Sequence, residues 1–195
     1  MKIFLSSTFR DLVPERDAVL KALIRKRESV NAMEYFGAEP STPLNTALQH
    51  LRDSDVVLLV IGFKAGSLVP NTAGTTYTQA EYQEAVALGR PILAFLKNGK
   101  KSPRSNRIEW LNKERSQAKI KALEDFKREV GARYTWYPFT NPDQLALGVN
   151  QSLEKWESQG RPGARKTFSS ASDFFTLKAI EDRHSDPRFY DDAAR

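Results

Sequence analysis

Glu81 is the residue whose position in the chain points most directly to chemistry. The residues around it, 77–96, predict a helix that begins at Thr78 and ends at Gly89, followed at once by a strand over residues 92–96. A carboxylate in the first turn of such a helix can close a capping box with Thr78. It can also project into a cleft at the carboxyl edge of a sheet and act on a ribose. These residues alone leave both interpretations open.

The composition restricts the available chemistry to carboxylates, hydroxyls and backbone groups. The 195 residues include no cysteine, which excludes disulfides, thiolate nucleophiles and thiolate metal sites. The two histidines, His50 and His184, have no second ligand at helical spacing. We therefore expect no metal site, no Ser/His/Asp triad and no resident cofactor.

The distribution of apolar residues bears on location. The sequence has no continuous apolar run close to the ~20 residues that span a bilayer. It also has no cationic and apolar leader of the kind that directs secretion. We expect a cytoplasmic protein with no membrane partner.

The net charge of +6 is unevenly spread, and basic residues are densest between positions 97 and 121. Such a patch could bind polyphosphate or nucleic acid by releasing counterions. It lacks the regular aromatic residues on which single-strand binders stack bases, so a solvated loop and helix face is the favoured interpretation. The basic residues of the patch are Lys97, Lys100, Lys101, Arg104, Arg107, Lys113, Arg115, Lys119 and Lys121.

Strands and helices are expected to alternate along the first part of the chain. The expected strands cover residues 2–6, 30–36, 55–62, 92–96 and 134–139. The expected helices start near Pro14, Thr42, Thr78, Lys113 and Asn141. Residues 55–62 are apolar on both faces, which is typical of a central parallel strand covered by helices on both sides.

This alternation predicts an α/β fold with a doubly wound, flavodoxin-like sheet of five parallel strands in the order 2-1-3-4-5. In that order the crevice opens beyond the ends of strands one and three, where the winding direction reverses. The loops that reach this point are residues 6–11 and 62–77, and Glu81 follows the second loop. The predicted topology therefore brings three separate features to one cleft.

The domain is expected to cover residues 1–160. Beyond the sequence Gln-Gly-Arg-Pro-Gly that ends at residue 163, the composition becomes typical of a linker. We interpret residues 161–195 as a linker or tail, which could lead into a further domain.

Several segments together resemble a known family. They are residues 2–12, which include Ser-Ser-Thr-Phe-Arg-Asp-Leu, and residues 33–38, 54–55, 62–67 and 77–91. They look like the TIR-like domain-of-unknown-function family 4062, whose members stand at the N-terminus of larger defence or signalling proteins. The resemblance covers residues 1 to about 158 and implies a TIR-like fold.

A weaker resemblance connects the chain to TIR enzymes that cleave NAD. In those enzymes an aromatic residue precedes the catalytic glutamate by four positions, with alanine four and glycine eight positions after it. Tyr77, Glu81, Ala85 and Gly89 match this spacing, and Ser67 matches a serine common in that pattern. Nucleoside deoxyribosyltransferases share the same layout and use a glutamate there as nucleophile.

These resemblances imply roles for individual residues. Glu81 would be the catalytic carboxylate that stabilises positive charge on the ribose or attacks its anomeric carbon. The crevice loops would supply the substrate-binding residues: Ser6, Ser7, Thr8, Arg10, Gly62, Phe63, Ser67 and Tyr77. Each has a structural alternative, since the serines could cap the first helix, Arg10 could pair with Asp11 or Glu34, and the aromatic rings could belong to the core.

Three functions are compatible with these residues. The first is an effector domain that cleaves the N-glycosidic bond of NAD or a related nucleotide, activated by self-association or by a partner or sensor domain. The second is a non-catalytic module for interaction or for recognition of a nucleotide signal. The third is a base-exchange transferase acting on nucleosides or nucleotides.

Overall fold

The fold is built on a five-stranded parallel sheet. The computed structural model describes residues 1–72, 74–99 and 114–160. The strands are β1 (Lys2–Ser7), β2 (Ser29–Asn31), β3 (Val56–Ile61), β4 (Ile92–Lys97) and β5 (Trp136–Phe139). They pair in the order β2-β1-β3-β4-β5, and each pairing is parallel, which confirms the predicted fold class and strand order.

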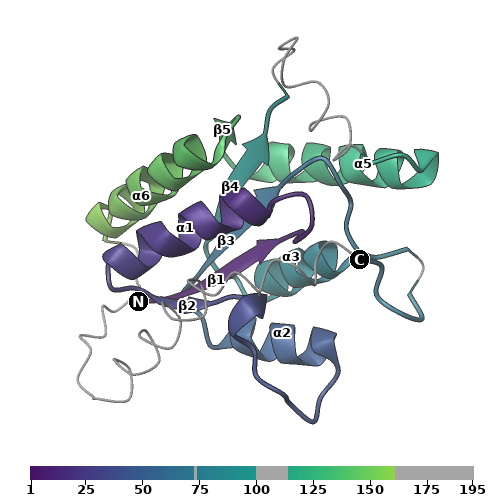
Figure 1. Cartoon of the computed structure of the whole chain (residues 1–195), viewed down its shortest axis with the longest axis horizontal. Helices are drawn as coiled ribbons and strands as arrows, with labels where there is room; N and C mark the ends of the chain where they lie inside the picture. Colours follow the sequence, from purple (N-terminus) through teal and green to yellow (C-terminus); the bar gives the residue numbers. More distant parts are fainter. Residues whose placement is uncertain (73, 100–113, 161–195) are drawn as a thin grey trace.

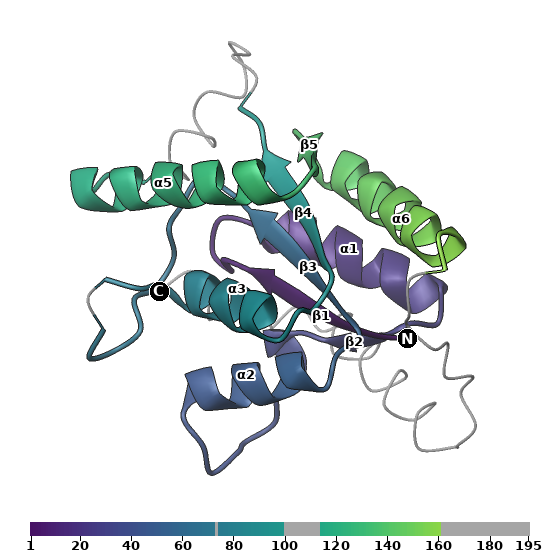
Figure 2. The same cartoon turned by 180° about the vertical axis from the view of Figure 1, so that it is seen from behind.

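Helices cover both faces of the sheet. They are α1 (Val13–Arg25), α2 (Pro43–Arg52), α3 (Tyr77–Ala87), α5 (Gln117–Arg133) and α6 (Pro142–Ser158), with a short 3-10 helix η1 (Met33–Tyr35). Helices α1 and α6 lie on one face (Figure 1), and α2, α3 and α5 lie on the other (Figure 2). This arrangement is the doubly wound layering that crossover connections of one hand produce.

The central strand β3 holds the two layers together. All six of its residues are buried, as the uninterrupted apolar run predicts. Val56, Leu58 and Val60 pack into the cluster under α1 and α6. Val57, Leu59 and Ile61 pack into the cluster under α2, α3 and α5. Each face of this one strand therefore supports a separate half of the core.

The helix ends follow the expected capping chemistry at two positions and differ at a third. Thr42 and Asn141 cap α2 and α6 through their side-chain oxygens, each with a proline in the first turn. Helix α3, in contrast, has Thr76 as its N-cap, and Gln79 completes the capping box. The expected box of Thr78 and Glu81 is therefore wrong, and the Glu81 carboxyl is not needed to cap its own helix.

Gly89 ends α3 as predicted. Its φ of 63° is in the left-handed region, and its N–H donates to the carbonyl of Val86 at 3.1 Å. Three other boundaries differ from the predictions. The strand expected over residues 30–36 ends at Asn31, and η1 follows it, while α5 begins at Gln117 and β5 at Trp136.

Some predictions fall outside the described residues. They concern the part of the basic patch at positions 100–113 and the linker or tail at 161–195. Within the described residues, no helix is both long enough and apolar enough to cross a membrane.

Candidate functional site

The end of β1 connects to helices on both faces of the sheet. Consecutive residues of a strand point to opposite faces, so Ser6 and Ser7 face different layers. The Ser6 hydroxyl donates to Glu81 Oε2 of α3 at 2.5 Å, and the Ser7 hydroxyl accepts from Arg16 Nη1 of α1. The structure thus brings Ser6 and Glu81 together across 75 positions of sequence, as the predicted cleft requires.

The pKa of the Glu81 carboxyl lies well above the ordinary value for this group. Burial raises its pKa to about 7, while the hydrogen bond from Ser6 and the positive charge of Arg16 act in the opposite direction. A carboxyl group in this state can bind or release a proton near neutral pH. None of these causes is a capping contact, because Thr76 and Gln79 form the cap of α3.

Arg16 and Glu34 form a buried ion pair beside this site. Arg16 Nε and Nη2 donate to the two carboxylate oxygens of Glu34 at 2.6 and 2.5 Å, and both side chains are almost fully buried. Arg10 was the arginine predicted to bind substrate, with Asp11 or Glu34 as its structural alternative partner. Arg10 is instead exposed, and Arg16 is the arginine that meets Glu34. One sequence signal could have identified Arg16: it stands between Leu12 and Leu20 on the apolar face of α1, where a charged residue is unusual.

Asp11 fastens the two loops of the cleft to each other. Its Oδ2 accepts hydrogen bonds from the backbone N–H groups of Phe63 and Lys64, both at 3.1 Å, and its Oδ1 accepts from the Thr8 hydroxyl. A Cβ at Gly62 would collide with Asp11 Oδ2, so this position requires glycine. Thr8 and Gly62 therefore lie close together, as predicted, and the neighbour of both is Asp11.

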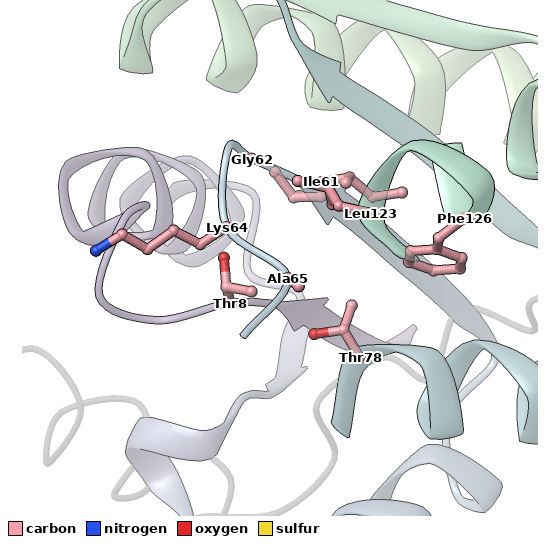
Figure 3. Close-up of a pocket in the computed structure, with 9 residues that line it drawn as sticks. Thr8, Ile61, Gly62, Lys64, Ala65, Thr78, Leu123 and Phe126 are labelled. Carbon is pink, nitrogen blue, oxygen red and sulfur yellow. The ribbon is translucent and has the colours of Figure 1, made fainter. Parts of the chain in front are cut away.

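A small cavity lies beside these loops at the carboxyl end of β3 (Figure 3). Thr8 and Thr78 contribute the hydroxyl groups of its lining, and Lys64 directs its ammonium away from Thr78 and Phe126. The other lining residues are Val60, Ile61, Gly62, Ala65, Leu123 and Phe126. Glu81 does not line this cavity, although Thr78 precedes it by one turn of α3.

Two lysines lie close to the ring of Phe63, which is half-buried. Lys97 Nζ lies 5.5 Å and Lys127 Nζ 5.6 Å from the centroid of its ring. Burial lowers the pKa of Lys127, with the charges of Asp11 and Glu124 acting against that effect. Lys97 also pairs with Glu15 at 2.6 Å. The ring thus already has cationic partners where base stacking was predicted.

Ser67 and Tyr77 lie at the base of the loop between β3 and α3. The N–H of Tyr77 donates to the Ser67 carbonyl at 3.1 Å, and Leu68 forms an antiparallel bridge with Thr76. Ser67 is exposed and Tyr77 is half-buried at the first position of α3. These backbone contacts join the two ends of the loop, so the side chains of Ser67 and Tyr77 lie at its base.

In the described part of the chain, no group of three or more histidine, aspartate or glutamate side chains is arranged to hold a metal ion.

The family model of a domain of unknown function (DUF4062) matches residues 2–154. The chain belongs to this family. The matched part of this DUF4062 domain contains the whole site, from Ser6 at the end of β1 to Glu81 in α3. No curated protein matches the chain.

Among solved structures, the DUF4062 domain is similar to the TIR domains in the structure of the activated Roq1 resistosome directly recognizing the pathogen effector XopQ. The two share 14% sequence identity, with a TM-score of 0.41 over 93% of this chain and 98% of that chain.

Proposed function

We propose that this domain cleaves the N-glycosidic bond of NAD or a related nucleotide, with Glu81 as the catalytic carboxylate. The observation that supports this most is the hydrogen bond from Ser6 to Glu81, 2.5 Å long, at the reversal point of the sheet. Gln79 caps the helix, so Glu81 has no structural task at the helix end. A defence or signalling role as a TIR-like effector is part of the same proposal.

The chemistry suits a site with one carboxylate. Breaking the bond between C1′ of the ribose and nicotinamide leaves the electron pair on the ring nitrogen and builds oxocarbenium-like charge on the sugar. The pyridinium leaves as a neutral base, so no general acid is needed. Ionised Glu81 stabilises the cation, Ser6 holds the carboxylate in position, and water bonds to C1′ and releases a proton.

The ionisation of Glu81 sets the pH dependence of this step. Only the ionised carboxylate stabilises the cation, and its pKa is about 7. The active fraction therefore grows as the pH rises through about 7, and nicotinamide release should increase over the same range.

The test is nicotinamide release from NAD by the full chain, compared between wild type and Glu81→Gln. We expect the substitution to reduce the rate about 10²- to 10³-fold, the range found when a stabilising group at the transition state is removed. Glu84→Gln is the matched control, because Glu84 lies on the same helix and pairs with Arg52 at 2.7 Å on the surface. It should retain the wild-type rate and pH profile.

The assay should be run over a range of protein concentrations, because we propose that self-association or a partner domain completes the cleft. Comparable rates for wild type and Glu81→Gln would contradict the proposal, as would wild-type protein that releases no nicotinamide even when assembled. Free purine or pyrimidine bases in the same assay would reveal base exchange as a new nucleoside product.

A non-catalytic recognition module is the second candidate. It is favoured by the cavity at the end of β3, whose lining includes Thr8 and Thr78 but not Glu81. Calorimetry with NAD and other nucleotides would support this function if binding occurs without turnover and survives Glu81→Gln.

A further inference from the structure

Arg16 is buried in the layer opposite to Glu81, yet it belongs to the same network. Its side chain is 3% exposed and Glu34 is 6% exposed. All three of its nitrogens have partners, because Nε and Nη2 bind Glu34 while Nη1 binds the Ser7 hydroxyl. Its guanidinium carbon also lies 5.9 Å from the centroid of the Phe9 ring. A side chain held at so many points has little freedom to move towards a ligand.

The partner of Arg16 is adjacent in sequence to the partner of Glu81. Ser7 hydrogen-bonds Arg16 on the α1 side of the sheet, and Ser6 hydrogen-bonds Glu81 on the α3 side. Ser6 is fully buried and is paired in the sheet with Leu59 of β3. The strand end is therefore held from both faces, and fixing Ser7 also fixes the direction in which Ser6 presents its hydroxyl.

The charges around Glu81 single out Arg16. From the strand, only the neutral Ser6 hydroxyl contacts the carboxyl; from α1, the positive charge of Arg16 acts on it. On the neighbouring helices, Arg52 of α2 pairs with Glu84, and Lys127 of α5 faces Asp11 and Glu124. Among the described residues, Arg16 is therefore the charge that counteracts the effect of burial on Glu81.

We propose that Arg16 is the positioning residue of this site: through Ser7 it fixes the end of β1 and, with it, the Ser6 hydroxyl that holds Glu81. The positive charge of Arg16 also acts on Glu81, in the direction opposite to burial. Glu34 holds the guanidinium in place and limits the positive charge that reaches Glu81. The catalytic meaning of this assignment rests on the function proposed above, whereas the electrical coupling of Arg16 and Glu81 does not.

The coupling can be measured without substrate. Carboxyl ¹³C NMR of the full chain follows the titration of Glu81, whose signal is identified by its loss in Glu81→Gln. Arg16→Gln should raise the pKa of Glu81 by roughly half a pH unit or more, because an opposite charge is removed. Arg16→Lys keeps the charge and should leave the pKa close to the wild-type value. Glu34→Gln should lower it, because the compensating negative charge is lost.

The opposite signs separate electrostatic positioning from a merely structural role. If Arg16→Gln and Glu34→Gln change the pKa in the same direction, or if Arg16→Lys acts like Arg16→Gln, the assignment is wrong. Each single substitution leaves a buried charge without its partner, so Arg16→Gln/Glu34→Gln provides a neutral replacement pair if the single variants do not fold. It should raise the pKa of Glu81 by less than Arg16→Gln alone, because the losses of the two charges act in opposite directions, and a pKa at or below the wild-type value would overturn the proposal.

The activity assay then supplies the functional arm. In an active preparation, Arg16→Gln should move the rising limb of the rate profile to higher pH by the same amount as the NMR titration. A matching NMR shift without any dependence of nicotinamide release on Glu81 would remove the proposed function and leave the coupling intact. A Glu81-dependent activity with no shift in either measurement would remove the role of Arg16 alone.

Discussion

At the scale of the residue, the chemistry of Glu81 and the stability of the fold respond to pH in opposite directions. The Ser6 bond and the Arg16 charge do not fully offset the burial of the carboxyl, whose pKa remains at about 7. The ionised form that we propose for catalysis is therefore the form that the folded protein disfavours. Carboxyl groups whose ionised form is destabilised by folding are common at functional sites.

Glu81→Gln should consequently change the pH dependence of stability. The carboxyl titrates near its ordinary value of 4.5 when unfolded and near 7 when folded, so the folded state binds more protons between these values. The stabilising effect of protonated Glu81 is complete below about pH 4.5 and is lost as the pH rises through about 7. Wild type should lose about 1–3 kcal/mol relative to Glu81→Gln over this interval, less than the full pKa shift implies because Glu81 as a whole residue is only half-buried.

Urea unfolding of both proteins at several pH values between 4 and 8 measures this difference. Stability curves that run parallel across the interval would show that Glu81 titrates normally in the folded state, whatever its role in catalysis.

At the scale of the element, helix α3 shows why its start could not be located from sequence. Thr76 and Thr78 are each followed, three positions later, by a residue that can complete a capping box. That residue is Gln79 for Thr76 and Glu81 for Thr78. The structure uses Thr76, whose hydroxyl accepts from the Gln79 N–H at 3.2 Å. Thr78 is buried instead and lines the cavity. Two overlapping capping motifs thus give one helix start and leave Glu81 for another task.

Thr76→Ala should lower the free energy of unfolding by about 0.5–2 kcal/mol, because the Gln79 N–H and the start of α3 lose their cap. Urea denaturation measures the loss, and Thr42→Ala at the exposed start of α2 gives a comparison of the same chemistry. A change at Thr76 below the error of that measurement would mean that the cap does not stabilise α3.

Sequence patterns predicted the elements better than the contacts between them. The apolar run of β3 and the alternation of strands and helices were sufficient for the sheet order, because parallel crossovers allow few arrangements. The same patterns brought Ser6 and Glu81 to one edge. They did not reveal Arg16, since a charged residue in a helix is ordinarily assigned to the solvated face. Its pairing with Glu34 depends on how η1 packs against α1, and side-chain pairing at that distance leaves no trace in one sequence.

At the scale of the whole molecule, the last described helix completes a layer begun by the first. Val19, Leu20 and Leu23 of α1 share a core cluster with Val149, Leu153 and Trp156 of α6. This face of the sheet is therefore closed only when residues far apart in sequence have come together. The α1 layer, which carries Arg16, depends on that closure for its rigidity.

Leu153→Ala should therefore destabilise the entire domain by about 2–5 kcal/mol, the range for a large-to-small change in a packed core. Leu147→Ala is the matched control on the same helix, because Leu147 is 53% exposed and Leu153 is 1% exposed. It should change stability by no more than about 0.5 kcal/mol. Chemical denaturation followed by circular dichroism measures both, and similar losses in the two variants would contradict the packing of α6.

The carboxylate of Asp11 limits how far the two loops beside the cavity can move apart. It accepts hydrogen bonds from Thr8 in the loop after β1 and from two successive backbone N–H groups in the loop after β3. Asp11 therefore ties these two loops to each other. If the proposed nucleotide binds beside these loops, we expect their spacing at Asp11 to stay fixed and any adjustment to occur in the outer turn beyond the bridge between Leu68 and Thr76.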